Sequence, residues 1–261
     1  MKAKIKITLD NISFEYDEKN KVFAKHSMDL EFKFGLYGII GPSGTGKTTL
    51  VSILGGQLKP SSGKVLVNEI DIYSLGDAKR KEIIAMQLQT STAMRGNLKY
   101  NLLFGIPTKE DGEAQYSDQD LEKVLTQVGL WTIFFNKDGL ETLIGEGGIN
   151  LSGGQRQRLN FASLYLRAKY FKPQIILIDE PTSSLDEISE HSITSMIDEL
   201  SSHSVTFVVA HRLKTLEKAL ALIDSSLFQK TDIIKAYTNS ELQKESEYYR
   251  NVLQGVVILD S

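Results

Sequence analysis

The chain has 261 residues, 41% of them hydrophobic, which is enough for one large domain or two small ones with a substantial core. Its 30 Lys and Arg against 33 Asp and Glu give a formal net charge of −3, so the basic excess typical of nucleic-acid-binding or anionic-membrane-binding proteins is missing. The absence of cysteine excludes disulfides, thiolate metal sites and a cysteine nucleophile. No apolar run approaches a signal peptide or the ~20 residues of a transmembrane helix, so we expect a globular chain that does not span a membrane by itself.

Alternating apolar and polar residues mark the beginning of the chain. In residues 4–16, KIKITLDNISFEY, and residues 26–34, HSMDLEFKF, an apolar side chain recurs at roughly every second position, as a half-buried antiparallel sheet requires. The pattern then changes. A short apolar run, GLYGII, stops at Gly41, and KTTLVSILGGQL follows with helical spacing, which predicts a buried strand, a turn and a helix.

The middle of the chain, residues 90–150, is polar and has helical character. The stretch TKEDGEAQYSDQD is typical of a loop, and it precedes LEKVLTQVGLWTIFF, in which apolar residues recur with helical spacing. We interpret this region as a helical insert.

Strand patterns return after the insert. The apolar runs QIILID and VTFVVA are separated by EISEHSITSMIDEL, a segment with helical periodicity. This alternation is expected of a parallel sheet covered by helices. We therefore predict an α/β core, which no repeat, low-complexity tract or long linker divides.

The stretch GPSGTGKTT, residues 41–49, matches the pattern G-x-x-x-x-G-K-[ST] in full and lies between the predicted strand and helix. Glycines let backbone N–H groups turn inward around phosphates, and the helix start adds partial positive charge. Lys47 reaches the β- and γ-phosphates, and the Thr48 hydroxyl can ligate Mg²⁺. An ordinary glycine-rich turn is the alternative, which the complete match disfavours. The predicted phosphate-binding residues are Gly41, Ser43, Gly44, Thr45, Gly46, Lys47, Thr48 and Thr49.

Two carboxylates follow the second predicted strand of the core. In IILIDEPT the strand ends in Asp179 and Glu180, at the sheet edge where ligands of open α/β folds bind. Asp179 would hold Mg²⁺ directly or through water, and Glu180 would orient or deprotonate the water that attacks the γ-phosphate. Alone, such a pair is more often a solvated helix cap, but the phosphate loop upstream favours the catalytic interpretation.

With these residues in place, the chain resembles the ATPases of ATP-binding cassette (ABC) transporters. LSGGQRQR, residues 151–158, is similar to the signature sequence of that family. The resemblance implies that two cassettes face each other head to tail, so that the phosphate loop of one and the signature of the other enclose one ATP. A helix cap alone would explain Leu151 and Ser152 but not the glycines and glutamine that follow. The predicted signature contacts are Ser152, Gly153, Gly154 and Gln155.

The remaining family motifs occur in the expected order. Tyr16 matches the aromatic residue that stacks on adenine, although a strand tyrosine often serves packing alone. Gln89 matches the glutamine that contacts Mg²⁺ and water, with Gln87 as a nearby rival. Asp186, in SSLD, corresponds to the D-loop. His211, in VVAHRL, corresponds to the switch histidine near the γ-phosphate. A lone histidine after a strand normally lies at the surface, but this sheet edge is the expected catalytic edge.

Finer features resemble exporter-type cassettes. The segment TLIGEGGINLSGGQ contains Glu146, whose family counterpart lies near the coupling helices of the membrane domain, and the tail TNSELQKESEYYRNVL resembles the exporter ending. Several positions depart from the exporter pattern without touching an expected phosphate, metal or water contact: Gly147, Ser163, Pro181, Tyr237 and Asn239.

The expected fold class is therefore α/β, a P-loop NTPase core with a mostly parallel sheet, an N-terminal antiparallel β-subdomain and a helical insert subdomain. We expect a single domain over residues 1–261. Residues 1–89 and 159–261 form the core with the antiparallel subdomain, and residues 90–158 form the helical subdomain that ends in the signature.

The resemblance implies an ATP-hydrolysing nucleotide-binding subunit or domain of an exporter-like ABC transporter, with ATP and Mg²⁺ bound by the residues named above. Lys47, Gln89, Glu180 and His211 would act in catalysis, and Thr48, Gln89 and Asp179 would hold the metal. The implied partners are a transmembrane domain or subunit and a second cassette, identical or not, which would place the chain at the cytoplasmic face of a membrane. No nucleic-acid partner is expected.

Two other functions stay open at the level of sequence. One is a regulatory cassette that dimerises on ATP but hydrolyses it too slowly to power transport, against which the intact Glu180 and His211 argue. The other is a soluble ABC ATPase that acts on DNA or ribosomes. That class needs coiled-coil arms or tandem cassettes, and the sequence has neither a heptad tract nor a second cassette.

Overall fold

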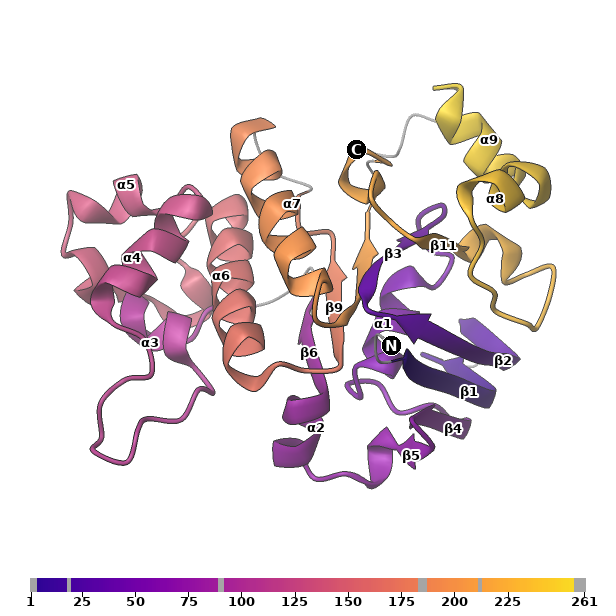
Figure 1. Cartoon of the computed structure of the whole chain (residues 1–261), viewed down its shortest axis with the longest axis horizontal. Coiled ribbons are helices and arrows are strands. Elements are labelled where there is room, and N and C mark those ends of the chain that lie inside the picture. The colour runs from indigo at the N-terminus through magenta and orange to yellow at the C-terminus, as the bar shows by residue number, and fades with distance from the viewer. Residues whose placement is uncertain (1–3, 18–19, 89–91, 183–186, 211–212, 256–261) are drawn as a thin grey trace.

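The structure is a computed structural model that describes residues 4–17, 20–88, 92–182, 187–210 and 213–255. Its centre is a five-stranded sheet with the order β11-β3-β10-β9-β6, in which every pair of neighbours is parallel (Figure 1). The strands are rich in Ile, Leu and Val because both faces of a parallel sheet are covered. They are β3 (Gly35–Ile40), β6 (Ile84–Gln87), β9 (Ile175–Asp179), β10 (Val205–Val209) and β11 (Ala221–Asp224). The predicted α/β core is confirmed.

A second, antiparallel sheet has the order β2-β1-β4-β5. In β1, Ile5, Ile7 and Leu9 are buried and the residues between them are more exposed, which is the alternation read from the sequence. The predicted N-terminal antiparallel sheet is therefore confirmed, with two further strands that the sequence pattern did not reveal. Its strands are β1 (Lys4–Glu15), β2 (Lys21–Lys33), β4 (Ser62–Val67) and β5 (Ile70–Asp71).

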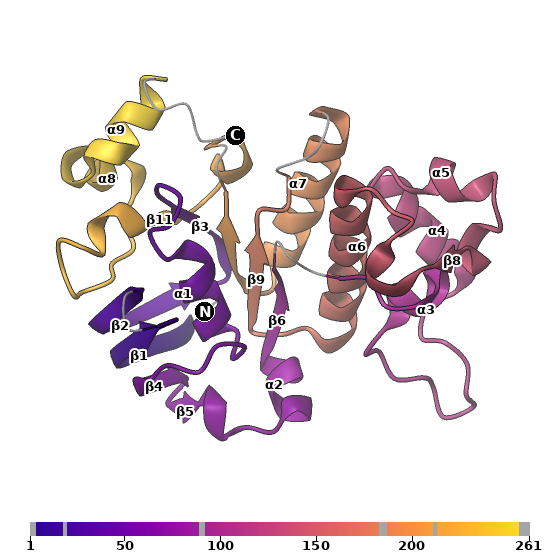
Figure 2. The same ribbon diagram turned by 180° about the vertical axis from the view of Figure 1, so that it is seen from behind.

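Helices cover both faces of the parallel sheet. On one face, α6 (Gly153–Phe171) and α7 (Glu187–Ser201) lie side by side in both views (Figures 1 and 2), and Ile176 and Ile178 of β9 pack with them. On the other face, Ile175 and Leu177 pack with α1 (Lys47–Leu54) and the antiparallel sheet. Successive side chains of β9 thus point to opposite faces of the sheet and pack in different cores, as the two-residue period of a strand requires.

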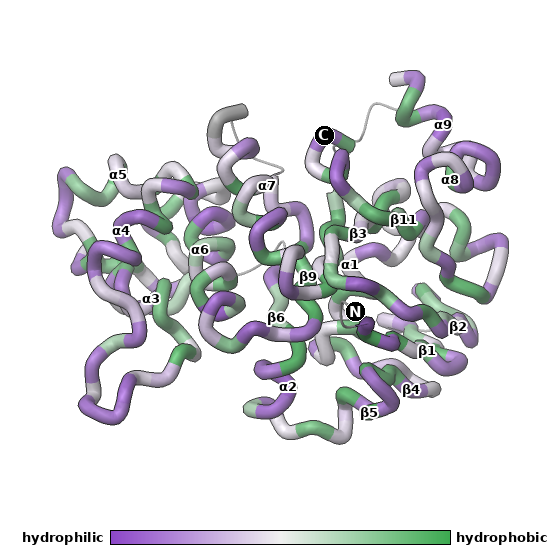
Figure 3. The backbone as a smooth tube through the Cα atoms, in the orientation of Figure 1, coloured by the Kyte–Doolittle hydropathy of each residue, from purple (hydrophilic) through white to green (hydrophobic). Residues whose placement is uncertain are grey.

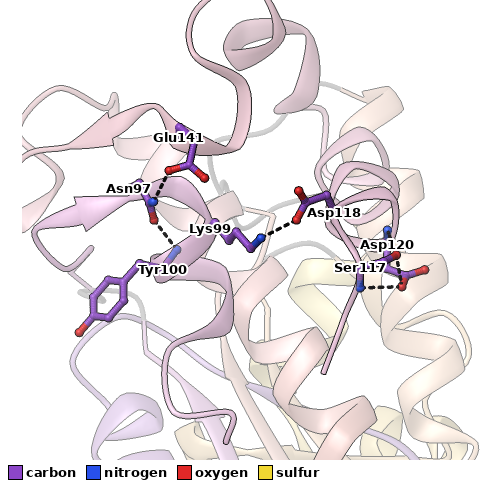
Figure 4. A network of polar contacts seen from close by, with 7 residues as sticks. All are labelled: Asn97, Lys99, Tyr100, Ser117, Asp118, Asp120 and Glu141. Atoms are coloured by element: carbon purple, nitrogen blue, oxygen red, sulfur yellow. Dashed lines mark hydrogen bonds and ion pairs between the residues drawn. The ribbon is translucent and has the colours of Figure 1, made fainter. Parts of the chain in front are cut away.

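The insert is mostly helical, as predicted, and also contains a two-stranded ribbon of β7 and β8. Polar residues fix the helix starts and join the helices (Figure 4). Asn97 caps α3 by accepting a 2.7 Å hydrogen bond from the Tyr100 N–H, Ser117 and Asp120 form a capping box at α4, and Lys99 pairs with Asp118 at 2.6 Å. The insert contains α3 (Leu98–Leu103), α4 (Asp118–Gln127), α5 (Trp131–Phe135), β7 (Gly96–Asn97) and β8 (Leu143–Ile144).

The hydropathy of the backbone follows this arrangement (Figure 3). The strands in the middle of the molecule are largely hydrophobic, whereas the long loop between α3 and α4 is mostly hydrophilic. The predicted boundary between residues 158 and 159 falls inside α6, so one continuous helix connects the insert to the core.

Shorter helices complete the described chain. They are α2 (Asp77–Ile83), α8 (Asn239–Glu245), α9 (Glu247–Leu253) and the 3₁₀ turns η1 (Ile72–Ser74), η2 (Gly139–Glu141), η3 (Glu146–Gly148), η4 (Leu213–Leu216) and η5 (Ser225–Leu227). Among the helices of the described ranges, none combines the length and the apolar character that crossing a lipid bilayer requires.

Candidate functional site

The phosphate-loop stretch joins the carboxyl end of β3 to α1. Gly41, Gly44 and Gly46 have φ values of 136°, 76° and 97°, a region that favours glycine. Gly46 is the N-cap of α1 and, within the described residues, no side chain caps the helix by a hydrogen bond. The first N–H groups of α1 therefore lack the capping side chain that most helices have, which suits an anion.

A cavity of about 470 Å³ opens over this loop. It brings together three segments that are far apart in the sequence: the end of β1, the phosphate loop, and the residue after β9. Its volume lies within the range of small-molecule sites. The lining residues are Tyr16, Asn20, Val22, Ser43, Gly44, Gly46, Lys47, Thr48, Thr49 and Glu180. Asn20 and Val22 were not predicted from the sequence.

Lys47 lies at the bottom of the loop. Its Nζ donates 2.8 Å hydrogen bonds to the carbonyl oxygens of Gly41 and Pro42, and the residue is buried. Burial lowers the pKa of Lys47, and the carboxylates of Glu180 and Asp179 oppose that shift. The loop thus holds a partly desolvated cation at the place where an anion would approach.

Tyr16 lies at the rim of the same cavity. The residue is 59% exposed, its ring packs edge-on against Phe14 at 5.0 Å between centroids, and its hydroxyl lies 3.1 Å from Thr49 Oγ1. One end of the ring is therefore held in place while much of its surface remains free to stack on a planar ligand.

Asp179 and Glu180 occupy the carboxyl end of β9. Asp179 is fully buried in the last position of the strand, opposite Val209 of β10. Glu180 has a φ of 52°, and its N–H donates to the Val209 carbonyl at 3.0 Å. Its own carbonyl accepts a hydrogen bond from the Gln157 side chain. A left-handed glutamate held by two neighbours is the kind of local strain found at functional sites.

The donor set near the loop fits Mg²⁺. A carboxylate at Asp179 and a hydroxyl at Thr48 are hard oxygen ligands, which this ion prefers. Thr48 is exposed in the cavity, and its hydroxyl makes no hydrogen bond to any described residue. In the ranges that the structure describes, no group of three or more His, Asp or Glu is arranged to hold a metal. A magnesium ion here would therefore depend on water and phosphate oxygens for its other ligands.

Three of the predicted residues, Gln89, Asp186 and His211, lie outside the described residues. The alternative to Gln89, Gln87, lies within the described residues. Gln87 is buried at the end of β6, and its Nε2 donates to the Gln157 carbonyl at 3.2 Å. Its side chain faces α6 and does not line the phosphate-loop cavity. This geometry favours Gln89 for the expected contact, which stays a prediction.

The signature stretch forms the start of α6. Ser152 is the N-cap, its hydroxyl accepts from the Gln155 N–H at 3.2 Å, and the Gln155 side chain accepts from the Ser152 N–H at 3.0 Å. A helix cap therefore accounts for Gln155 as well as Ser152, contrary to our expectation. It does not use the N–H groups of Gly153 and Gly154, the first residues of the helix.

The two glycine-containing stretches are not brought together within one chain. The described residues that line the phosphate-loop cavity do not include Ser152, Gly153, Gly154 or Gln155. Ser152 and Gly153 are exposed to solvent instead.

Two residues near the loop were missed in the sequence. Ser225, the first residue of η5, lies 2.5 Å from Thr45, Oγ to Oγ1. Gln157 contacts Glu180 as described above. Ser225 follows β11 as Glu180 follows β9, but β11 has only four residues, which are too few for a recognisable strand pattern. The sequence carries no sign for Gln157 either.

Comparison with known proteins points to one family. Residues 26–183 match the family described as ABC transporter. A Rickettsia felis protein whose name describes an export ATP-binding/permease protein is 32% identical over 95% of this chain and 41% of its own length. The ATP-dependent lipid A-core flippase of Nitrosococcus oceani is 34% identical over 95% of this chain and 40% of its own length. The chain thus spans about two fifths of these relatives.

A solved structure extends the comparison to the fold. A bacterial Atm1-family ABC exporter with ATP bound superposes with a TM-score of 0.78 at 23% identity, covering 98% of this chain and 42% of the exporter chain. At this identity the likeness concerns the fold alone. It agrees with the P-loop NTPase architecture predicted from the sequence.

Proposed function

This chain belongs to the ABC transporter family, and we propose that it is the ATP-hydrolysing nucleotide-binding domain or subunit of an exporter-like ABC transporter. The observation that carries the proposal is the cavity in which Tyr16, the phosphate loop and Glu180 meet. In it, adenine stacks on Tyr16 and the phosphates lie against the uncapped start of α1. Lys47 and Thr45 belong to the loop that surrounds them.

Glu180 is the residue we assign to the chemical step. Its carboxylate orients a water molecule and takes a proton from it as the water oxygen attacks the γ-phosphorus. The bond between that phosphorus and the oxygen retained by ADP then breaks. Lys47 stabilises the charge on the β- and γ-phosphates, while Thr48 and Asp179 would hold Mg²⁺. When bound, this ion neutralises the phosphate oxygens.

The signature stretch completes the site of a second cassette in this proposal. The Ser152 oxygen accepts a hydrogen bond from its own helix, and a hydroxyl also has a hydrogen to donate. That hydrogen and the N–H groups of Gly153 and Gly154 suit a γ-phosphate held by the other copy. The family resemblance assigns Gln89, Asp186 and His211 to the same composite site, and residues 90–158 to the subdomain that presents Ser152.

A groove beside α6 supports the proposed transmembrane partner. This cavity of about 380 Å³ is lined by Arg167, Met86 and Phe104, which is 39% exposed. Arg167 has no hydrogen bond or ion pair with any described residue, and burial lowers the pKa of its guanidinium. A partner segment that carries an apolar side chain and a carboxylate would fit both features. Docking there would hold the chain at the cytoplasmic face of the membrane.

The proposal is tested with the purified chain. We expect Mg²⁺-dependent release of phosphate from ATP, and an ATP-dependent increase in molar mass by light scattering from one chain to two. Lys47→Ala is the control, because it removes the cation between the phosphates and should weaken ATP binding ~10-fold or more. ATP binding without hydrolysis would favour the regulatory cassette, and equal ATP affinity of parent and Lys47→Ala would contradict the site itself.

A further inference from the structure

We infer that Ser225 is a positioning residue for the phosphate loop and connects ATP binding to the C-terminal helix α9, an inference that rests on the ATP site proposed above. Ser225 does not line the cavity and would not touch the nucleotide. Its effect would be exerted through Thr45 and the backbone of the loop.

The sheet topology brings Ser225 to the loop. Strand β11 is the parallel neighbour of β3, with Asp224 opposite Ile40, the residue before Gly41. Ser225, the first residue of η5, therefore lies beside the start of the phosphate loop. Ser225 is fully buried there.

The Ser225 hydroxyl contacts both sides of the loop. It lies 3.0 Å from the Ile40 carbonyl oxygen and 2.5 Å from Thr45 Oγ1, which lies 2.7 Å from the Pro42 carbonyl oxygen. Each hydroxyl has one hydrogen to donate, so the two hydrogens serve two of these three contacts at a time. The fit leaves no spare space, since a Cβ atom added to Gly41 would lie 2.0 Å from Ser225 Oγ. One buried side chain thus fixes the separation between the entry of the loop and Thr45.

The next residue back in the chain extends these contacts to α9. Asp224 is buried, and one of its carboxylate oxygens accepts from the Ser226 N–H at 2.8 Å. The other accepts from the hydroxyl of Ser246, which is fully buried and caps α9 by accepting from the Tyr249 N–H at 2.9 Å. Hydrogen bonds of Ser225 and of Asp224, which are joined by a peptide bond, therefore connect the phosphate loop to the start of α9.

This arrangement matters because an anion site made of backbone N–H groups depends on their fixed directions. A loop that must be ordered by the ligand itself binds more weakly than one ordered beforehand. Asp224 also adds negative charge near Lys47, which favours the protonated form of that lysine.

The first experiment compares Ser225→Ala with Ser204→Ala. Ser204 is also a buried serine, and it donates to the Pro173 carbonyl at 2.6 Å, before β10 and away from the cavity. Both variants lose one buried hydroxyl, so both should lower the melting temperature. We expect only Ser225→Ala to weaken ATP binding, by about tenfold, measured by equilibrium titration.

A double-mutant cycle tests whether Ser225 acts through Thr45. Thr45→Val removes the hydroxyl with little change of shape. The double variant, Thr45→Val with Ser225→Ala, should have the same ATP affinity as whichever single variant binds ATP more weakly. Fully additive losses would overturn the assignment. So would ATP affinity within twofold of the parent in Ser225→Ala, or an equal loss in Ser204→Ala.

Ser246→Ala tests the connection from the other end and leaves the contacts of the loop intact. We expect ATP binding to weaken about threefold, less than in Ser225→Ala because the effect passes through Asp224. Unchanged affinity in Ser246→Ala would overturn the connection to α9. These results remain distinct from a failure of the proposed function, in which the parent chain itself would not bind ATP.

Discussion

Helices α1 and α6 both begin in glycine-containing stretches that the sequence assigns to phosphate binding, and they begin differently. The N-cap of α1 is Gly46, which provides no side-chain cap among the described residues. The N-cap of α6 is Ser152, which forms a complete capping box with Gln155. The N–H groups at the start of α1 have no side-chain cap and can bind a ligand, whereas the start of α6 is already capped and still has hydrogen-bond donors available. This difference fits the site that we propose to be shared between two chains.

Removal of the Glu180 carboxylate should have the largest effect. It distinguishes the chemical step from ATP binding at the site that includes the start of α1. We expect Glu180→Gln to lower ATP turnover ~10²-fold or more, because an amide cannot accept the proton of the attacking water. ATP affinity should stay close to that of the parent, since the loop contacts are intact. The measurements are steady-state phosphate release and equilibrium ATP titration. Turnover within a few-fold of the parent would mean that another residue is the base.

A negative charge on the α6 side should act only across the interface between chains. Aspartate is a good N-cap, so Ser152→Asp keeps the helix start but repels a γ-phosphate. We expect unchanged ATP binding and ~10-fold or greater loss of turnover, the cost of losing a hydrogen bond to a charged group. A mixture of Ser152→Asp and Lys47→Ala should recover activity, because the mixed dimer has one site with both halves intact.

The mixing experiment needs proof of subunit exchange, which differently labelled chains provide by energy transfer. If Ser152→Asp hydrolysed ATP normally while light scattering showed a monomer, the signature would have no role in a second chain.

The cap itself should contribute a smaller, purely structural effect. Ser152→Ala removes the cap of α6, and Ser117→Ala removes the equivalent capping box of α4 (Figure 4). Each should lower the free energy of unfolding by ~1 kcal/mol in urea titrations. Only Ser152→Ala should also lower turnover. Equal turnover in the two variants would leave Ser152 with the role of a cap alone.

The last comparison concerns stability alone and two arginines that line the groove beside α6. Arg80 donates to the carbonyl oxygens of Ile72, Gly56 and Leu75, whereas Arg167 has no such contacts within the described chain. We expect Arg80→Met to destabilise the chain by ~1–3 kcal/mol, because it leaves carbonyl groups without donors. Arg167→Met should be neutral or stabilising by up to ~1 kcal/mol. A clear loss of stability in Arg167→Met would show that the guanidinium is satisfied within the chain.

The sequence predicted the parts of the fold that depend on local patterns. Strand β3, the phosphate loop and α1 follow from an apolar run, a fixed glycine spacing and a helical period, and β9 with Asp179 and Glu180 follows from the same logic. Short strands such as β6 and β11 could not be predicted, because four residues are too few to show a periodicity.

Contacts between distant residues could not be predicted. Thr45 and Ser225 are 180 positions apart, and their contact exists only because β11 pairs with β3. Gln157 meets the Glu180 carbonyl because α6 packs beside β9, which no local pattern encodes. The capping box at Ser152 is visible in the sequence as S-x-x-Q, and one hydroxyl can both cap the helix and donate to a ligand.

The contact between Gln157 and the Glu180 carbonyl has a consequence for cooperativity. Gln157 and Ser152 lie on the same helical segment of α6, and an α-helix is stiff over such a short length. In the proposed dimer, a phosphate that draws Ser152 toward a second chain would therefore also act on the backbone of Glu180 in the first. Occupancy of one nucleotide site would thus alter hydrolysis at the other, and the dependence of turnover on ATP concentration should be sigmoidal, with Gln157→Ala returning it to a hyperbola.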